Sequence, residues 1–229
     1  MLLDVVIPSL HRRDKLQVCI SSILKSAKSD EINLSIFFSD KEDLEYFHSY
    51  FSAISNIRLH YLEHYSVPMF WNNYLKQMTA DGMFYCNDDT ELFDDTLEII
   101  LTEYPKHFPD YDGLMGICQA NLDSSQALES AFGVIGRKYA SRFLNKQVYC
   151  PDYERFFGDR EMWLYAKSIN KFYFCKEAKL NHYHPALNHA WEDETHTNVR
   201  TYLKQDRTTF QRRQTKGYLW GKDYSLINI

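Results

Sequence analysis

Short apolar runs alternate with helical patterns through the first half of this chain. The β-branched run at 5–8 includes a proline, and apolar residues then recur at helical spacing over 14–27. The alternation continues, and it predicts further strands at 34–38, 57–61 and 83–86 and further helices at 41–53, 67–79 and 94–104. Because elements that alternate in this way pack as layers, we expect an α/β fold with a largely parallel sheet.

The second half has a less regular pattern. We expect a helix at 158–168 and strands at 114–118, 131–135, 172–175 and 178–181, some of them added antiparallel to the sheet. The spacing of Val199, Tyr202, Leu203 and Phe210 predicts an amphipathic helix over 193–213. We see no internal repeat or interdomain linker, so we expect residues 1–229 to form one domain.

Composition excludes several classes of protein. With 26 Lys and Arg against 31 Asp and Glu, the net charge of -5 argues against a polycation of the histone kind. The five cysteines form no CxxC pair, which fits a reducing compartment, and no stretch of about 20 apolar residues indicates a membrane span. No GxGxxG follows the first strand, which disfavours a nicotinamide dehydrogenase. We therefore expect a cytoplasmic protein without a membrane anchor.

Polar side chains follow four of the predicted strands. They lie at 8–12, at Ser39 and Asp40, at 87–89 and around His182. In open α/β sheets ligands bind beyond the carboxyl ends of the strands, and carboxylates placed there can hold a hard divalent cation beside phosphates. This layout suits a nucleoside diphosphate.

Several segments resemble, by their residues, order and spacing along the chain, the inverting family 2 glycosyltransferases, whose fold is called GT-A. VVIPSLHRRDKLQVCISSI resembles the opening strand and helix of that family, and FYCNDDTELFDDTLEII resembles its metal-binding segment in the Asn-x-Asp-Thr-Glu version of rhamnosyltransferase-like members. WNNYLKQMTADGMF resembles the helix before that segment. YERFFGDREMWLYAKS and AKLNHYHP resemble the acceptor-side helix and the terminal histidine strand. The resemblance covers roughly residues 3 to 185.

The resemblance implies a GT-A fold with a Rossmann-like, mixed and mostly parallel sheet. It divides the chain into a nucleotide-sugar half (1–105), an acceptor half (106–190) and a basic aromatic helix and tail (191–229). It implies Mn2+ or Mg2+ bound by Asp89 and by His182 or His184. We expect those two histidines to point to opposite faces, so that only one contacts the metal. The nucleotide-sugar would be bound by Pro8, Ser9, Arg12, Asp40, Asn72, Asn87 and Asp88.

Asp159 falls on the position of the catalytic base in this resemblance. Glu161, in the same Asp-Arg-Glu run, is the alternative base. A single displacement assisted by that base would invert the anomeric carbon. Departures from the family pattern are Asn87 at the first acidic position, 66–71 in place of a small-residue turn, and Gly158 where a glutamate is usual.

Basic residues gather near the end of the chain. Segment 200–222 holds seven Lys and Arg against Asp206 alone, with aromatic residues between them. Such a surface can hold phosphates and stack bases, and Arg207, Arg212, Arg213 and Lys216 are our candidates for acceptor binding. The segment has a weaker resemblance to small phage-encoded glycosyltransferases that modify hydroxymethylated pyrimidines in DNA. A saccharide, a lipid-linked glycan and a plain solvated helix face remain alternatives.

Two other classes of function stay open at this point. A metal hydrolase would use the cluster of His182, His184, His189, His196, Glu192, Asp193 and Glu194, although this cluster lacks an HExxH spacing. A non-catalytic module would bind nucleotide or DNA without releasing sugar. Asp88 and Asp89 could also serve only as helix caps, Asp40 as a turn residue and Arg12 as a solvated loop charge.

Overall fold

A computed structural model describes residues 1–26, 30–63, 66–123, 128–184 and 194–222. The strands are β1 (Leu3–Ser9), β2 (Ile32–Phe38), β3 (Ile57–Tyr61), β4 (Gly82–Tyr85), β5 (Thr90–Leu92), β6 (Leu114–Gln119), β7 (Gly133–Gly136) and β8 (Phe172–His182). The helices are α1 (Arg13–Ser26), α2 (Lys41–Phe51), α3 (Val67–Gln77), α4 (Thr96–His107), α5 (Arg137–Ala140), α6 (Gly158–Ser168) and α7 (Glu194–Thr215), with a 3-10 turn at Leu144–Lys146.

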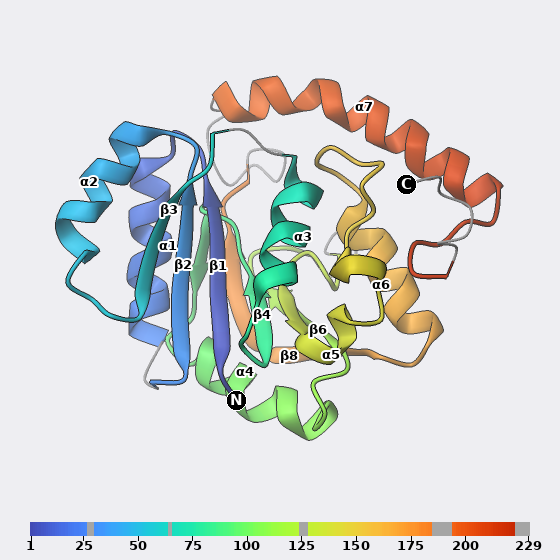
Figure 1. Ribbon diagram of the computed structural model, residues 1–229, viewed down its shortest axis with the longest axis horizontal. Coiled ribbons are helices and arrows are strands. Elements are labelled where there is room, and N and C mark those ends of the chain that lie inside the picture. Colours follow the sequence, from blue (N-terminus) through green and yellow to red (C-terminus); the bar gives the residue numbers. More distant parts are fainter. Residues whose placement is uncertain (27–29, 64–65, 124–127, 185–193, 223–229) are drawn as a thin grey trace.

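The eight strands form one mixed sheet in the order β3-β2-β1-β4-β7-β6-β8-β5 (Figure 1). Strands β3, β2, β1 and β4 are parallel, β7 enters antiparallel between β4 and β6, and β8 runs parallel to β6. The chain winds from β1 outward to β3 and then returns to the other side of β1 with β4. The carboxyl ends of β1 and β4 therefore border the point where the winding reverses, which is where open α/β sheets bind ligands.

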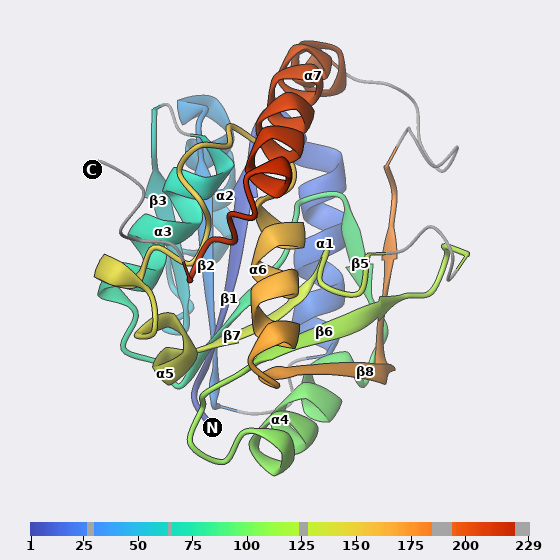
Figure 2. The ribbon, with the colours of Figure 1, turned by 90° about the vertical axis from the view of Figure 1, so that its right-hand side faces the viewer.

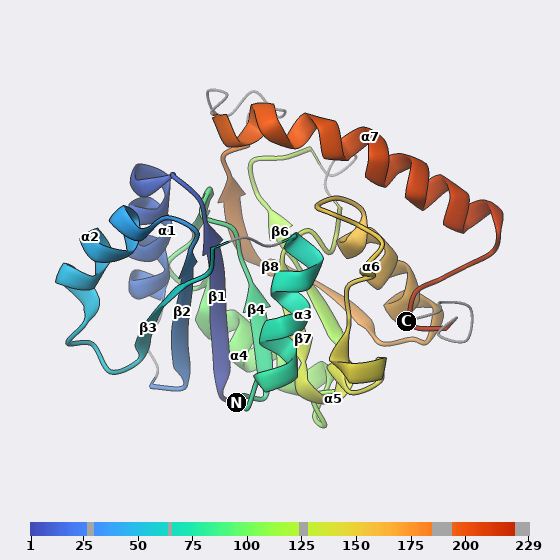
Figure 3. The same cartoon turned by 45° about the horizontal axis from the view of Figure 1, so that its top comes forward.

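Adjacent side chains of β1 belong to two separate cores. Val5 of β1 packs with α1 and α4 on one face, whereas Val6 packs with α3, α5 and α6 on the other. Figure 3 shows α1 and α3 on either side of β1. Both faces of the sheet are covered, as the continuous apolar runs predict.

Helix α7 lies across the end of the molecule at which β1 ends and passes above α6 (Figures 1 and 2). Phe210 of α7 stacks on Phe157 with ring centroids 5.0 Å apart, and Trp220 beyond the helix is buried. The amphipathic helix predicted at 193–213 is therefore confirmed at Glu194–Thr215.

The α/β class, the parallel core of the sheet and the antiparallel additions are confirmed, and the architecture is that of a Rossmann-like GT-A fold. Three details differ from the prediction. The runs at 172–175 and 178–181 belong to one strand, β8, whose pairing with β6 shifts register between Ile117 and Cys118. The short elements β5 and α5 were not predicted, because three or four residues give no periodicity to detect.

Candidate metal and nucleotide site

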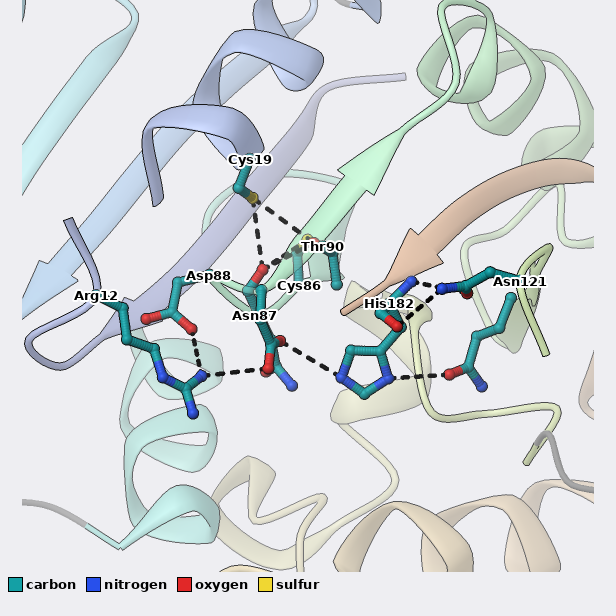
Figure 4. A network of polar contacts seen from close by, with 10 residues as sticks. Arg12, Cys19, Cys86, Asn87, Asp88, Thr90, Asn121 and His182 are labelled. Atoms are coloured by element: carbon teal, nitrogen blue, oxygen red, sulfur yellow. Dashed lines mark hydrogen bonds and ion pairs between the residues drawn. The ribbon is translucent and has the colours of Figure 1, made fainter. Parts of the chain in front are cut away.

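Asp88 joins the ends of β1 and β4. Its Oδ2 accepts a hydrogen bond from Ser9 Oγ at 2.9 Å, and its Oδ1 accepts one from Arg12 NH1 at 2.8 Å (Figure 4). The same Arg12 nitrogen lies 3.2 Å from Asp89 Oδ2. Because Asp88 and Asp89 are engaged with Arg12, and Asp95 occupies the N-cap position of α4, the helix-cap reading of the two aspartates is excluded.

Strand β5 brings Asp89 and His182 together from positions far apart in the sequence. Thr90 of β5 pairs antiparallel with His182, the last residue of β8, and Tyr183 N–H donates to the carbonyl of Asp89 at 2.8 Å. As a result His182 Nε2 lies 3.4 Å from Asp89 Oδ1. The two residues that the family resemblance assigns to a metal therefore face each other.

Two buried atoms at this contact lack a hydrogen-bond partner within the described part of the chain. They are Asp89 Oδ1 and His182 Nε2, and both side chains are largely buried. Carboxylate oxygens and imidazole nitrogens are common ligands of divalent metal ions. These two unsatisfied atoms face each other, so they fit as two ligands of one Mn2+ or Mg2+ ion. Since no group of three or more protein ligands occurs among the described residues, a metal here would need further ligands from water or a bound phosphate.

Two residues that the sequence reading missed hold His182 in place. Gln119 Oε1 lies 3.2 Å from His182 Nδ1, and the Asn121 side chain exchanges two 2.9 Å hydrogen bonds with the His182 backbone (Figure 4). Both residues follow or end β6, so the rule that polar side chains at strand ends form the site would have found them.

The two aspartates are driven in opposite directions by their surroundings. Burial raises the pKa of Asp88 to about 6, against the opposing effect of Arg12. Burial also acts to raise the pKa of Asp89, but the adjacent His182 ring and Arg12 outweigh it and lower that pKa to about 2. Asp89 is therefore held as a carboxylate, the form that binds a cation.

His184 does not point away from His182. The two ring centroids are 5.4 Å apart, so the prediction of opposite faces is wrong. The physical reason is that residues two apart in an extended segment share a face. His184 thus lies on the same side as the Asp89 contact.

A cleft of about 620 Å³ opens beside this cluster, between the starts of α1 and α2. Arg12 and Asp40 both line it. Asp40 is also the N-cap of α2 and accepts from Asp43 N–H at 2.8 Å, so its turn role is real, while its partly exposed carboxylate still borders the cleft. Pro8 in β1 and Asn87 after β4 are both partly buried at the same edge of the sheet.

Asn72 is not available to a ligand. Its side chain is 3% exposed and exchanges two hydrogen bonds with the backbone of Tyr149, at 2.7 and 2.9 Å. The structure therefore contradicts the expectation that Asn72 binds the nucleotide-sugar, because its buried amide ties α3 to the loop at Tyr149.

Asp159 lies at the start of α6 and is linked to the end of β4. Ser130 Oγ donates to the Asp159 carbonyl at 3.2 Å, and Tyr85 OH donates to the Ser130 carbonyl at 2.8 Å. Tyr85 is the last residue of β4, just before 86–89. Removal from water raises the pKa of Asp159, against two backbone N–H groups that lower it.

Glu161 is buried in a network of hydrogen bonds within the protein. It is 2% exposed, and it accepts hydrogen bonds from Tyr153 OH, Trp220 N–H and the Arg213 guanidinium at 2.8 to 3.1 Å. Because both oxygens of Glu161 are used inside the protein in this way, Asp159 stays the favoured candidate for the base.

Arg213 is contradicted as an acceptor-binding residue for the same reason. It is 3% exposed and bridges Glu161 and Asp152. The other three candidates, Arg207, Arg212 and Lys216, are exposed on α7 and just after it. Of the proposed hydrolase cluster, His189, Glu192 and Asp193 lie outside the described residues.

Comparison with known proteins adds the fold and no sequence relative. No protein-family model matches the chain, and no curated protein matches it. No helix in the described ranges is long and apolar enough to cross a membrane.

The solved structures similar to this chain include TarS from S. aureus and a mannosyltransferase. TarS from S. aureus matches with a TM-score of 0.61 and 12% identity, and the match covers 79% of this chain and 36% of TarS. TarS 1-349 in complex with UDP matches with a TM-score of 0.59 and 12% identity, and the match covers 79% of this chain and 59% of that one. The mannosyltransferase PcManGT from Pyrobaculum calidifontis, in complex with GDP-Man and Mn2+, has a TM-score of 0.66 at 11% identity over 92% of this chain and 64% of that one. The chain therefore spans between about a third and just under two thirds of these proteins, and it shares their fold.

Proposed function

We propose that this chain is a metal-dependent, inverting glycosyltransferase that uses a nucleoside-diphosphate sugar. The observation that carries the proposal is the pair of unsatisfied buried atoms, Asp89 Oδ1 and His182 Nε2, at the strand ends of a GT-A fold. UDP in the TarS structure, and GDP-Man with Mn2+ in the PcManGT structure, support a donor and a metal of this kind.

The residues around the strand ends would divide the work of binding the donor. The cleft lined by Arg12 and Asp40 would take the nucleoside, with Ser9 and Asp88 fixing the Arg12 guanidinium at its inner edge. Asp89 and His182 would hold the divalent ion, which offsets the negative charge of the departing diphosphate. Pro8 and Asn87 would shape the same edge of the sheet.

Asp159 would act as the general base on the acceptor side. The acceptor oxygen forms a bond to the anomeric carbon, the bond from that carbon to the diphosphate oxygen breaks, and the electron pair leaves with the nucleoside diphosphate. The acceptor proton passes to Asp159, whose raised pKa makes it a better base than an ordinary aspartate. One displacement of this kind inverts the anomeric carbon.

The acceptor would be anionic, because the exposed side of the C-terminal segment is basic. Between 201 and 222 the exposed charged residues are all cations, namely Lys204, Arg207, Arg212, Lys216 and Lys222. DNA that carries hydroxymethylated pyrimidines is one anionic acceptor of this kind, and phosphate contacts would make its binding strongly salt-dependent. A neutral saccharide acceptor would show no such dependence.

Thermal unfolding with UDP, GDP, dTDP and CDP, each with and without Mn2+, tests the donor site. At about 100 times its dissociation constant a ligand adds roughly 2.7 kcal/mol, which raises the Tm by about 5 to 11 °C. We expect one nucleotide to give a shift that requires Mn2+ in the wild type and that is lost in Asp89→Ala and His182→Ala. Asp110→Ala, which removes an exposed carboxylate near the start of β6, is the control that keeps the shift.

Turnover separates an enzyme from a binding module. Asp159→Asn should lower the release of nucleoside diphosphate by at least about 100-fold while the Mn2+-dependent shift survives. A wild-type protein that binds nucleotide with Mn2+ but releases none from any donor would be a non-catalytic module, and no shift with any nucleotide would overturn the proposal.

A further inference from the structure

Asp206 on α7 is a fully buried carboxylate with an unusual set of partners. It is 0% exposed, and it accepts backbone hydrogen bonds from three consecutive residues, Glu154 at 3.1 Å, Arg155 at 2.8 Å and Phe156 at 2.8 Å. A row of backbone N–H groups that converges on one anion forms a strong, charge-assisted contact. Here the anion is supplied by the protein itself, from a helix about fifty residues later in the chain.

The three amides belong to the turn that leads directly into the proposed base. Phe157 follows them with φ of 68°, in the left-handed region, and Gly158 and Asp159 then begin α6. A non-glycine residue holds this conformation only where its surroundings enforce it. The position of Asp159 therefore depends on what fixes the turn.

Helix α7 supplies most of what fixes that turn. Besides Asp206, Phe210 stacks on Phe157 with centroids 5.0 Å apart, and the Arg160 guanidinium lies 5.4 Å from the Phe210 ring. On the other side the Glu154 carbonyl accepts from Val67 N–H at the start of α3. The turn is thus held between α3 and α7, and Asp206 is its only contact from α7 that carries a full charge among the described residues.

We propose that Asp206 is a positioning residue for Asp159, so that α7 completes the catalytic half of the site and is more than a surface for the acceptor. The inference rests on the proposed function, since it assigns Asp206 a part in the same reaction. Asp206 does not touch the reacting atoms. It fixes the backbone from which Asp159 projects.

Asp206→Asn tests the proposal, because the amide keeps the shape of the side chain but loses the charge and turns N–H groups toward the three backbone donors. Asp112→Asn is the matched control. Asp112 is another aspartate 2% exposed, paired with Arg142 and Lys171 just before the amino end of β6. Both variants lose a buried carboxylate, so a general loss of stability should affect them alike.

Two readouts are compared in both variants. The first is amide hydrogen exchange at 154–156, and the second is the release of nucleoside diphosphate from UDP-glucose or GDP-mannose in the presence of Mn2+, with water as the acceptor. In Asp206→Asn we expect faster exchange at 154–156 and a kcat about 100-fold lower, the size of effect that misplacement by about 1 Å produces, with donor KM unchanged. Asp112→Asn should change neither.

Unchanged exchange at 154–156, or unchanged kcat despite faster exchange, would overturn the positioning role of Asp206. An equal loss of kcat in Asp112→Asn would overturn it too, because the effect would then be one of stability. If the wild type itself releases no nucleoside diphosphate from any donor while exchange responds as expected, the proposed function is what has failed and the anchoring of the turn stands.

Discussion

The ring of His182 is oriented by a single amide. Gln119 Oε1 lies 3.2 Å from Nδ1, and because a carboxamide oxygen only accepts, this contact favours a proton on Nδ1 and turns Nε2 toward Asp89. Removing such an orienting partner typically costs 10- to 100-fold in metal affinity. We expect Gln119→Ala to weaken Mn2+ binding by about that factor in a calorimetric titration.

Gln17→Ala provides the control, since the Gln17 side chain lies at an exposed position on α1 and donates to Tyr46 OH. Equal Mn2+ affinity in Gln119→Ala and Gln17→Ala would show that His182 is not a ligand held through Gln119.

If Asp159 is the base, its pKa sets how the rate of the reaction depends on pH. Loss of solvent raises its pKa above that of an ordinary aspartate, about 3.9. A general base works in its ionised form, so kcat/KM should fall as the pH drops through this raised pKa, and should level off at higher pH. The pH–rate profile of the wild type, compared with that of Asp159→Asn, measures this.

The acid limb should disappear in the residual activity of Asp159→Asn. If the variant keeps the same limb at the same pH, a different group supplies the base.

Helix α6 and the last turn of helix α7 are joined by a buried ion pair. Arg213 NH2 lies 2.9 Å from Glu161 Oε1, and both side chains are under 5% exposed. Removing one partner of such a pair costs about 3 to 5 kcal/mol because the other charge is left buried, and in a chain of this length that lowers the Tm by roughly 6 to 20 °C. We expect Arg213→Met to show this loss by calorimetry.

The neighbouring Arg212 is exposed and serves as the matched control. Arg212→Met should leave the Tm unchanged. A similar fall in both variants would mean that the net charge, and not the buried pair, is responsible.

Helix α3 is tied to the loop at Tyr149 by Asn72, and the next residue of the helix offers a matched control variant. Asn72 is buried and satisfies both backbone groups of Tyr149, whereas the adjacent Asn73 is exposed. Each buried group left unsatisfied costs about 1 to 3 kcal/mol. Asn72→Ala should therefore lower the free energy of unfolding in urea by about 2 kcal/mol or more, and Asn73→Ala should not.

The elements with strong periodicity could be predicted from the sequence, and the contacts between distant segments could not. The strand at Ile57–Tyr61 and the helix at Gly158–Ser168 have the predicted bounds, because apolar spacing and turn residues define them locally. The partners of Glu161, Arg213 and Trp220, could not be predicted because they lie more than 50 residues away in the sequence. The sequence alone does not distinguish a charged residue at a helix start that faces a substrate from one that faces a buried guanidinium.

The candidate site as a whole shows the same division. Asp88, Asp89 and Arg12 were found because each follows a strand, and the sheet order then places them together. The contact with His182 depends on β5, a strand of three residues that no sequence window could detect. The residue types of the site can therefore be predicted from the sequence. The distance between Asp89 and His182 cannot, because it depends on how the strands pair in the sheet.

The charge of the molecule is distributed unevenly along the chain. The chain carries a net charge of -5, yet the exposed charges between 201 and 222 are all positive. If this segment binds a polyanion, each phosphate contact adds about 0.9 to the slope of log affinity against log salt. Replacing Arg207, Arg212 and Lys216 with glutamine should then lower the slope for a duplex DNA probe by about 2.7.

Replacing Lys25, Lys176 and Lys179 with glutamine removes the same total charge from exposed positions elsewhere. If both triple variants lower the slope equally, binding follows net charge and not the α7 surface. If the wild type shows no salt-dependent DNA binding at all, the acceptor is not a polyanion of this kind and the search moves to neutral glycans. The basic helix is connected to the acceptor only if the salt slope falls in the Arg207, Arg212 and Lys216 variant and not in the lysine control. Because α7 also carries Asp206, that result would place acceptor binding and base positioning in the same helix.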